Sequence, residues 1–343
     1  MWNVMGHEAA VTLLSRSLER DMLAHAYIFV GPPRVGKTAL ALALAQGVNC
    51  LAPTASRPCG ECGQCRRIAQ MRHPDVQIID RDAGAARSGP RTEIGIDQVR
   101  DVQHAAALLP YEGRCRVFIF QDADAISAEA SNALLKLLEE PPDSVLLVLL
   151  TTNSESVLPT ILSRCQVVDL NPLPLDAIVA ELQHVTDKSS REALELARLS
   201  GGRIGWALEA ARDPEIVSQY VRELERFAVL LDSGLEKRFA YAEEVASLFS
   251  RNREAALEQL RTAIGWWRYL LLVKEAGDEL APSIPARDSL QQSARWISTA
   301  EAVKAIRGTR ETIDCLEANV NPRLALEVLM LSLPRRNSNG RSV

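Results

Sequence analysis

The segment from Gly31 to Thr38, "GPPRVGKT", is the feature that most constrains the fold of this 343-residue chain. It matches G-x-x-x-x-G-K-[ST], a pattern whose glycines let backbone N–H groups surround phosphates. An apolar run, "AYIFVG", leads into it, and the strong helix formers of "ALALALAQGV" follow it. A strand, this loop and a helix in that order predict a nucleotide-binding α/β domain.

Within this loop, we predict that ATP or ADP with Mg²⁺ is held by Gly31, Pro32, Gly36, Lys37 and Thr38. Lys37 is placed to reach the terminal phosphates, and the Thr38 hydroxyl to hold Mg²⁺ at the start of the helix. The alternative is a loop that keeps this pattern and stays empty.

Apolar runs alternate with helical patterns through the first half of the chain. Near-continuous apolar strands are typical of a parallel sheet that is buried on both faces. A helix is predicted from Ser127 to Glu140, with Ser127 as its N-cap and two prolines to stop it. The predicted strands are 26–31, 75–80, 115–122, 145–152 and 165–170.

Beyond residue 171 the sequence indicates helices alone. We predict an α/β domain over 1–171, a small helical domain over 172–213, a larger helical domain over 214–334 and a disordered tail over 335–343. The pair Gly201 and Gly202 predicts a turn between two helices. A flexible loop is predicted from Asp82 to Arg91.

Composition narrows the class of protein. A hydrophobic content of 47% is ample for packed cores, and the length suits about two domains. The net charge of −5 argues against a protein that coats nucleic acid by bulk electrostatics. No apolar run approaches the ~18 residues of a membrane span, and the first residues lack an export signal. We therefore expect a cytoplasmic protein.

Four of the seven cysteines lie close together in "NCLAPTASRPCGECGQC". Their spacing suits tetrahedral Zn²⁺ with a Cys₄ ligand set, and four protein ligands leave no position for catalytic water. We predict a structural zinc in an insertion over 50–65, held by Cys50, Cys59, Cys62 and Cys65. The other three cysteines are interpreted as small buried hydrophobic residues. These are Cys115, Cys165 and Cys315.

The strand that should end in acidic residues departs from the pattern of a hydrolysing NTPase. Such enzymes place an Asp there for the Mg²⁺ shell, usually with a neighbouring Glu that activates water. Here "VFIF" is followed by Gln121, Asp122, Ala123 and Asp124. Asp122 is a candidate nucleotide-site residue, as the water-activating acid or, with a slipped register, as a metal ligand. The alternative is that Asp122 and Asp124 cap the following turn and helix.

One arginine, Arg164, lies in "LPTILSRCQVVDL" between a helical turn and a strand. It is interpretable as an ordinary surface or ion-pair residue. In ring-forming ATPases, an arginine on this edge can instead complete a neighbour's active site, because its planar fork stabilises charge on the transferring phosphoryl group.

Together these residues resemble the AAA+ clamp-loader family of bacterial DNA polymerase III. The similar stretches lie between Ala26 and Leu333, and the most specific is "NALLKLLEEPP" followed by "LPTILSRC". The resemblance implies a P-loop NTPase core with a parallel sheet, a small helical lid domain and an all-α collar domain for oligomerisation. Within the collar, Trp266 and Trp267 are candidates for an interface or for the core.

Two departures from the family favour its stator kind of subunit, delta-prime, over the ATP-hydrolysing gamma/tau kind. Gln121 and Asp122 stand where gamma/tau subunits carry Asp-Glu, and Gly205 stands where they carry a lid arginine that senses the γ-phosphate. The absence of a long extension after the third predicted domain points the same way. An unrelated AAA+ protein that binds DNA directly is the remaining alternative.

The stator resemblance implies a role for Arg164 as an arginine finger, acting in trans on ATP bound to an adjacent gamma/tau subunit. The implied assembly is a five-membered ring with gamma/tau and delta subunits, which opens the sliding clamp and loads it onto primed DNA. The chain itself would be a weak or inactive ATPase.

Overall fold

The computed structural model describes residues 2–81, 93–275, 277, 287–318 and 320–335. The loop predicted over 82–91 and residues 336–343 of the predicted tail lie outside this described part. The chain divides into two compact units, one of residues 1–181 with 202–206 and one of residues 182–201 with 207–343. Each unit is described by itself below, and the three predicted domain boundaries stay a prediction.

A five-stranded parallel sheet forms the centre of the first unit, as predicted. Its strand order is β2-β3-β4-β1-β5. Because all strands run in one direction, their carboxyl ends share one edge, where Val30 of β1 lies beside Thr151 of β4. The strands are β1 Ala26–Val30, β2 Val76–Ile79, β3 Arg116–Phe120, β4 Val145–Thr151 and β5 Gln166–Asp169.

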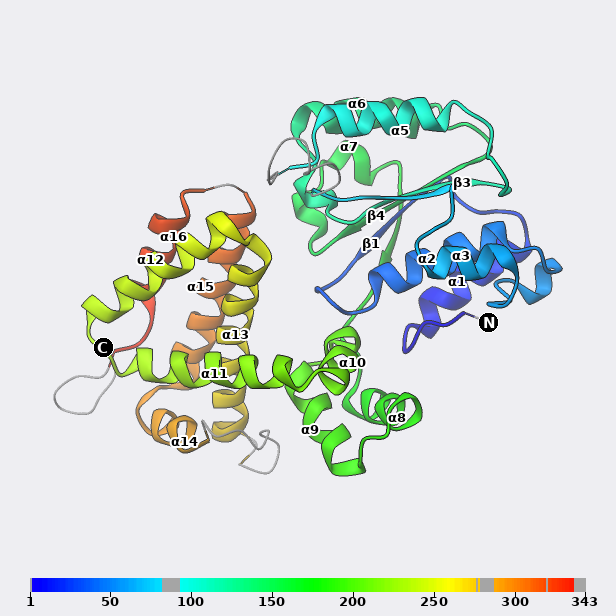
Figure 1. The fold of residues 1–343 in the computed structure, drawn as a ribbon. Coiled ribbons are helices and arrows are strands. Elements are labelled where there is room, and N and C mark those ends of the chain that lie inside the picture. Colours follow the sequence, from blue (N-terminus) through cyan, green and yellow to red (C-terminus); the bar gives the residue numbers. More distant parts are fainter. Residues whose placement is uncertain (1, 82–92, 276, 278–286, 319, 336–343) are drawn as a thin grey trace. The chain divides into compact units, whose positions relative to one another are not determined.

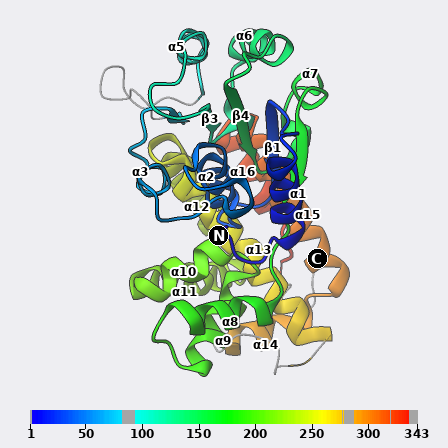
Figure 2. The same cartoon turned by 90° about the vertical axis from the view of Figure 1, so that its right-hand side faces the viewer.

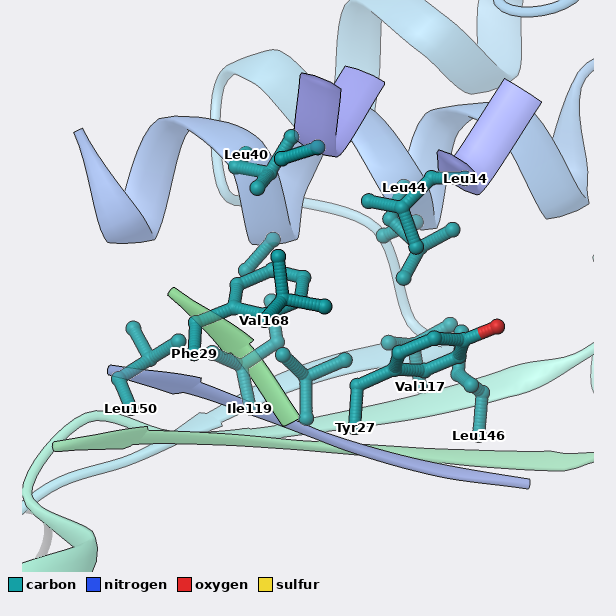
Figure 3. Close-up of a cluster of buried hydrophobic side chains, with 14 of the residues drawn as sticks. Leu14, Tyr27, Phe29, Leu40, Leu44, Val117, Ile119, Leu146, Leu150 and Val168 are labelled. Atoms are coloured by element: carbon teal, nitrogen blue, oxygen red, sulfur yellow. The ribbon is translucent and has the colours of Figure 1, made fainter. Parts of the chain in front are cut away.

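Helices cover both faces of this sheet, which explains the near-continuous apolar strands (Figure 1). On one face, Leu14 of α1 and Leu40 and Leu44 of α2 pack on Tyr27 and Phe29 (Figure 3). The opposite face is covered by α5 and α6. The helices of this unit are α1 Glu8–Glu19, α2 Lys37–Asn49, α3 Gly63–Ala69, α5 Ile96–Ala106, α6 Ala128–Glu139 and α7 Pro159–Leu162.

The predicted helix start at Ser127 is confirmed, since its side chain accepts a hydrogen bond from the N–H of Ala130. The turn predicted at Gly201 and Gly202 is confirmed too, and both glycines have positive φ.

Short 3₁₀ segments are η1 Thr54–Ser56, η2 Ala123–Ala125 and η3 Ser154–Ser156. Helices α8 Leu175–Val185 and α10 Ile204–Arg212 each contribute residues to both units.

In the second unit, long amphipathic helices surround an aromatic centre. Trp266 and Trp267 are completely buried and contact Phe227 edge-on, so the core interpretation of these tryptophans is confirmed. Its remaining helices are α9 Ser190–Ser200, α11 Pro214–Leu231, α12 Leu235–Arg251, α13 Arg253–Glu275, α14 Arg287–Trp296, α15 Thr299–Glu317 and α16 Pro322–Ser332.

A fully buried arginine on α12, Arg238, ties together the ends of two helices. Its guanidinium donates hydrogen bonds to the carbonyls of Leu231 at the end of α11, of Met330 and Leu333 at the end of α16, and of Pro334, at 2.7 to 3.2 Å. Burial lowers the pKa of Arg238 to about 10, so the side chain stays charged at neutral pH.

Helix α16 also presents an apolar stripe to solvent in the second unit. Leu324, Val328 and Leu331 are 59%, 65% and 49% exposed, and their spacing places them along one side of the helix. Its opposite side packs against α12 and α15. Within the described part of the chain, no helix combines the length and the apolar character needed to cross a membrane.

Candidate nucleotide site and cysteine cluster

The phosphate loop lies at the carboxyl edge of the sheet, between β1 and α2. Gly36 has a φ of +120°, a conformation that side chains rarely adopt, and it is the N-cap of α2. Lys37 donates from Nζ to the carbonyl oxygens of Gly31 and Pro32, at 2.5 and 3.0 Å. Thr38 lies in the first turn of the helix. The predicted loop residues are therefore together at a helix N-terminus, the arrangement that binds phosphate.

Two contacts that the sequence did not indicate hold this loop in place. His7 Nε2 lies 2.9 Å from the carbonyl oxygen of Val35, so this nitrogen carries the hydrogen that is donated. The N–H of Gly205 donates to the carbonyl of Arg34 at 2.8 Å, and a Cβ on Gly205 would lie 2.7 Å from that oxygen. His7 belongs to no motif, and the sequence marks Gly205 only as the position where gamma/tau subunits carry an arginine.

At the end of β3, Asp122 pairs with a residue outside every predicted site. Its carboxylate accepts a hydrogen bond from Arg81 Nε at 3.0 Å, and its side chain makes no cap on the following 3₁₀ turn. Burial raises the pKa of the Asp124 carboxyl. Gln121 thus supplies a neutral amide, and Asp122 supplies a carboxylate that is paired with Arg81. Asp124 supplies a half-buried carboxylate whose ionisation is disfavoured. The predicted role of Asp122 toward nucleotide stays a prediction.

The four clustered cysteines converge at the end of α2 and the start of α3. Their sulfur atoms all lie within 4.8 Å of one another. Tetrahedral Zn²⁺ with Zn–S bonds near 2.3 Å requires sulfur separations of roughly 3.8 Å. Cys50 and Cys65 are buried, and Cys59 and Cys62 are half-buried. The four residues therefore fit a structural zinc site, with the chain supplying all four ligands.

The four thiols differ in their environments: burial raises the pKa of Cys50 and of Cys65, whereas backbone N–H groups stabilise the thiolate of Cys59. Hydrogen bonds from the N–H groups of Cys62 and Glu61 lower the pKa of Cys59 to about 6. Outside the cluster, Cys115 and Cys165 are half-buried rather than fully buried as predicted, and desolvation raises the pKa of each thiol to about 12. The prediction that Cys315 is buried is wrong, because this residue lies exposed on α15.

Buried polar side chains on either side of the cysteine insertion bind the segment that enters β3. The carboxylate of Asp75 accepts hydrogen bonds from the N–H groups of Tyr111, Glu112 and Gly113 at 2.7 to 2.9 Å. Although burial opposes its ionisation, these amides and Arg116 hold the pKa of Asp75 below its ordinary value. The start of β2 is thus fixed to the segment that enters β3.

Asn49 lies at the end of α2, one residue before Cys50. Like Asp75, its side chain accepts hydrogen bonds from backbone N–H groups that lead into β3. Its amide oxygen accepts from the N–H groups of Arg114 and Cys115 at 2.8 and 3.0 Å, and its nitrogen donates to the Cys115 carbonyl. The end of the phosphate-loop helix and the start of β3 are therefore joined by hydrogen bonds.

Arg164 lies at the end of α7, just before β5, with its side chain 35% exposed. Its Nη2 donates to Glu139 at 2.7 Å, and its Nη1 donates to the Thr160 carbonyl at 2.9 Å and to the Ser163 hydroxyl at 3.3 Å. The ion-pair interpretation is therefore confirmed, while action on a neighbour stays a prediction. The sequence did not identify Glu139, although it ends the "NALLKLLE" helix.

Comparisons with known proteins find similarity to subunits of DNA polymerase III. A family described as "DNA polymerase III, delta subunit" matches residues 6–174. The delta' subunit of Bacillus subtilis is 28% identical over 94% of both chains. The tau subunit of Escherichia coli K12 is 36% identical over 64% of this chain and 34% of its own length. The chain thus spans about a third of that relative.

Among solved structures, a DNA polymerase III gamma subunit-related protein from Thermotoga maritima is similar over 94% of this chain and 97% of its own. The sequence identity is 21% and the TM-score is 0.43.

The parallel sheet with helices on both faces and the phosphate loop between β1 and α2 define an α/β fold of the P-loop nucleotide-binding class. The matches to the family model and to the Bacillus subtilis and Escherichia coli subunits make the class of protein more specific. The chain belongs to the clamp-loader subunits of bacterial DNA polymerase III.

Proposed function

We propose that this chain is the delta-prime, or stator, subunit of a DNA polymerase III clamp loader. In this role it lends Arg164 to the ATP site of a neighbouring gamma/tau subunit and hydrolyses little or no ATP itself. The assembly, a five-membered ring that includes a delta subunit, opens the sliding clamp and loads it onto primed DNA in the cytoplasm.

The observation that carries this proposal is the end of β3. A hydrolysing site needs a carboxylate for the Mg²⁺ shell and a second acid for water. Gln121 is neutral and a poor ligand for Mg²⁺, and the carboxylate of Asp122 is already paired with Arg81. The phosphate loop is intact beside these residues, which favours bound nucleotide with slow or no turnover.

Two further observations support the assembly. The Bacillus subtilis delta' subunit matches along 94% of its own length, whereas the tau relative from Escherichia coli matches along 34%. The exposed apolar stripe of Leu324, Val328 and Leu331 on α16 suits a contact with another helical subunit, as a collar domain requires. A gamma/tau-type motor is the alternative function.

Replacing Lys37 with alanine is expected to weaken ATP or ADP binding by about 10- to 100-fold, because a charge-assisted hydrogen bond to phosphate is lost. Isothermal titration with each nucleotide measures this change. Exposed Lys136 provides the control, since Lys136→Ala should leave the affinity unchanged. Equal nucleotide affinity in the Lys37→Ala protein would contradict the nucleotide-binding role.

Steady-state ATP hydrolysis by the purified chain separates stator from motor. We expect turnover no greater than that of the Lys37→Ala variant, because the carboxylate at the metal position is missing. Clear turnover above that blank would mean that Asp122 or Asp124 supplies the acid, and the motor function would replace the stator function.

The cysteine cluster is proposed to hold one structural Zn²⁺, which closes the insertion around Cys50 and the start of α3. When bound, the metal contributes to folding, because its ligands converge only in the folded state. In the chain itself, the N–H of Cys59 donates to the Cys50 sulfur at 3.4 Å and the N–H of Cys62 donates to the Cys59 sulfur at 3.3 Å.

The Cys59→Ser and Cys62→Ser substitutions are expected to remove zinc from the purified protein and to lower its melting midpoint by about 5 °C or more. Elemental analysis by mass spectrometry gives the metal content, with about one zinc expected in the unsubstituted chain. Exposed Cys315 offers a matched control, because Cys315→Ser should change neither quantity. A zinc content that Cys62→Ser leaves unchanged would rule out this site.

A further inference from the structure

Arg164 is held by groups from two elements of the first unit. The carboxylate of Glu139, the last residue of α6, accepts from Nη2 at 2.7 Å, and the carbonyl of Thr160 in α7 accepts from Nη1 at 2.9 Å. Helices α6 and α7 lie side by side in both views (Figure 1 and Figure 2). The guanidinium is therefore fixed at both of its terminal nitrogens.

These contacts leave part of the guanidinium able to bind an anion. Arginine carries five N–H donors in a planar fork. Within the described part of the chain, the contacts of Arg164 are those with Glu139, Thr160 and Ser163, which use three donors. At least two donors remain, and 35% of the side chain is open to solvent. The plane of the Arg164 guanidinium is therefore held in one orientation, while its remaining N–H donors stay available to an anion.

The position of Glu139 in the last turn of α6 does not favour the stability of that helix. A carboxylate in the last turn of a helix lies near the negative end of the helix dipole. Its side chain is also 50% exposed, and exposed ion pairs contribute little to stability. The contact therefore does more for the orientation of Arg164 than for the stability of the fold.

We propose that Glu139 is a positioning residue for Arg164: it holds the guanidinium in the orientation that a phosphoryl group on the neighbouring subunit requires. This inference rests on the proposed function, in which Arg164 acts in trans. A transferring phosphoryl group is stabilised only by donors that are already aligned with it. Without Glu139, Arg164 keeps its charge but samples several rotamers.

The test uses the reconstituted clamp loader with Glu139→Ala and Glu139→Gln. Because a glutamine amide oxygen still accepts a hydrogen bond from arginine, we expect Glu139→Ala to lower ATP turnover at saturating ATP by about 10-fold or more, and Glu139→Gln to lower it less. KM for ATP and the melting midpoint of the isolated chain should not change. The neighbouring exposed residue gives the matched control, since Glu140→Ala should leave turnover unchanged.

The outcomes separate this inference from the proposed function. If Arg164→Ala abolishes turnover at the adjacent site while Glu139→Ala behaves like Glu140→Ala, the positioning role is wrong and the stator function stands. If Arg164→Ala leaves turnover intact, both fail. A purely structural role for Glu139 would lower the melting midpoint or the yield of assembled complex and leave turnover per complex unchanged, which would also overturn the inference.

Discussion

Replacing Arg164 with alanine should lower ATP hydrolysis at the adjacent subunit of the reconstituted clamp loader by about 10³-fold or more. An arginine finger stabilises negative charge that develops on the transferring phosphoryl group, so its removal affects the chemical step more than the binding of ATP. Single-turnover hydrolysis at that one site is the suitable measurement, because other ATP sites of the ring contribute to the steady-state rate.

Lysine provides the informative second variant at this position. Arg164→Lys keeps the charge but loses the planar fork that contacts Glu139 and Thr160 together, so it should recover little of the lost rate. The isolated Arg164→Ala chain should fold and join the ring normally, since its side chain is partly exposed. A ring that hydrolyses ATP at the ordinary rate with Arg164→Ala would remove the basis for a stator function.

Replacing Arg238 with alanine is the second large effect, and it concerns stability. Four backbone carbonyls at the ends of α11 and α16 would lose a charged donor in the interior. The second unit should lose roughly 3–5 kcal/mol of unfolding free energy, because buried acceptors without partners are costly. Urea unfolding followed by tryptophan fluorescence measures this loss, since Trp266 and Trp267 lie in the same unit.

An exposed arginine on α11 serves as the comparison for Arg238. Arg222 forms an ion pair with Glu215 on the surface, and Arg222→Ala should leave the urea midpoint unchanged within error. An Arg238→Met variant, with an apolar side chain of similar length, should also be destabilised, because methionine has no N–H to donate. Equal midpoints for Arg238→Met and the unsubstituted chain would show that the four hydrogen bonds contribute nothing.

Features with a short-range signature were predictable from the sequence. The strand from Ala26 ends at Val30, and Ser127 caps α6. The spacing of the four clustered cysteines sufficed to bring their sulfurs within 4.8 Å, because these residues lie on one short insertion. In each case the determining interactions are local, so periodicity, capping and spacing were sufficient guides.

Features that depend on pairing between distant segments were not predictable. Arg81 and Asp122 are 41 residues apart, and Arg238 binds carbonyls more than 90 residues away. A single sequence places a residue on an element but does not indicate which residue faces it. Trp266 and Trp267 illustrate the same limit, because helical spacing alone did not distinguish a core position from an interface.

The contact between Gly205 and the phosphate loop has a consequence for how such a subunit can evolve. An arginine at 205 would place its Cβ 2.7 Å from the Arg34 carbonyl, so the loop or the start of α10 would have to move first. Restoring Asp at 121 would still leave Asp122 paired with Arg81. Under the proposed function, no single substitution regains hydrolysis. Selection acting one mutation at a time therefore finds no gradual route back to a motor, and the division of labour between subunits becomes difficult to reverse.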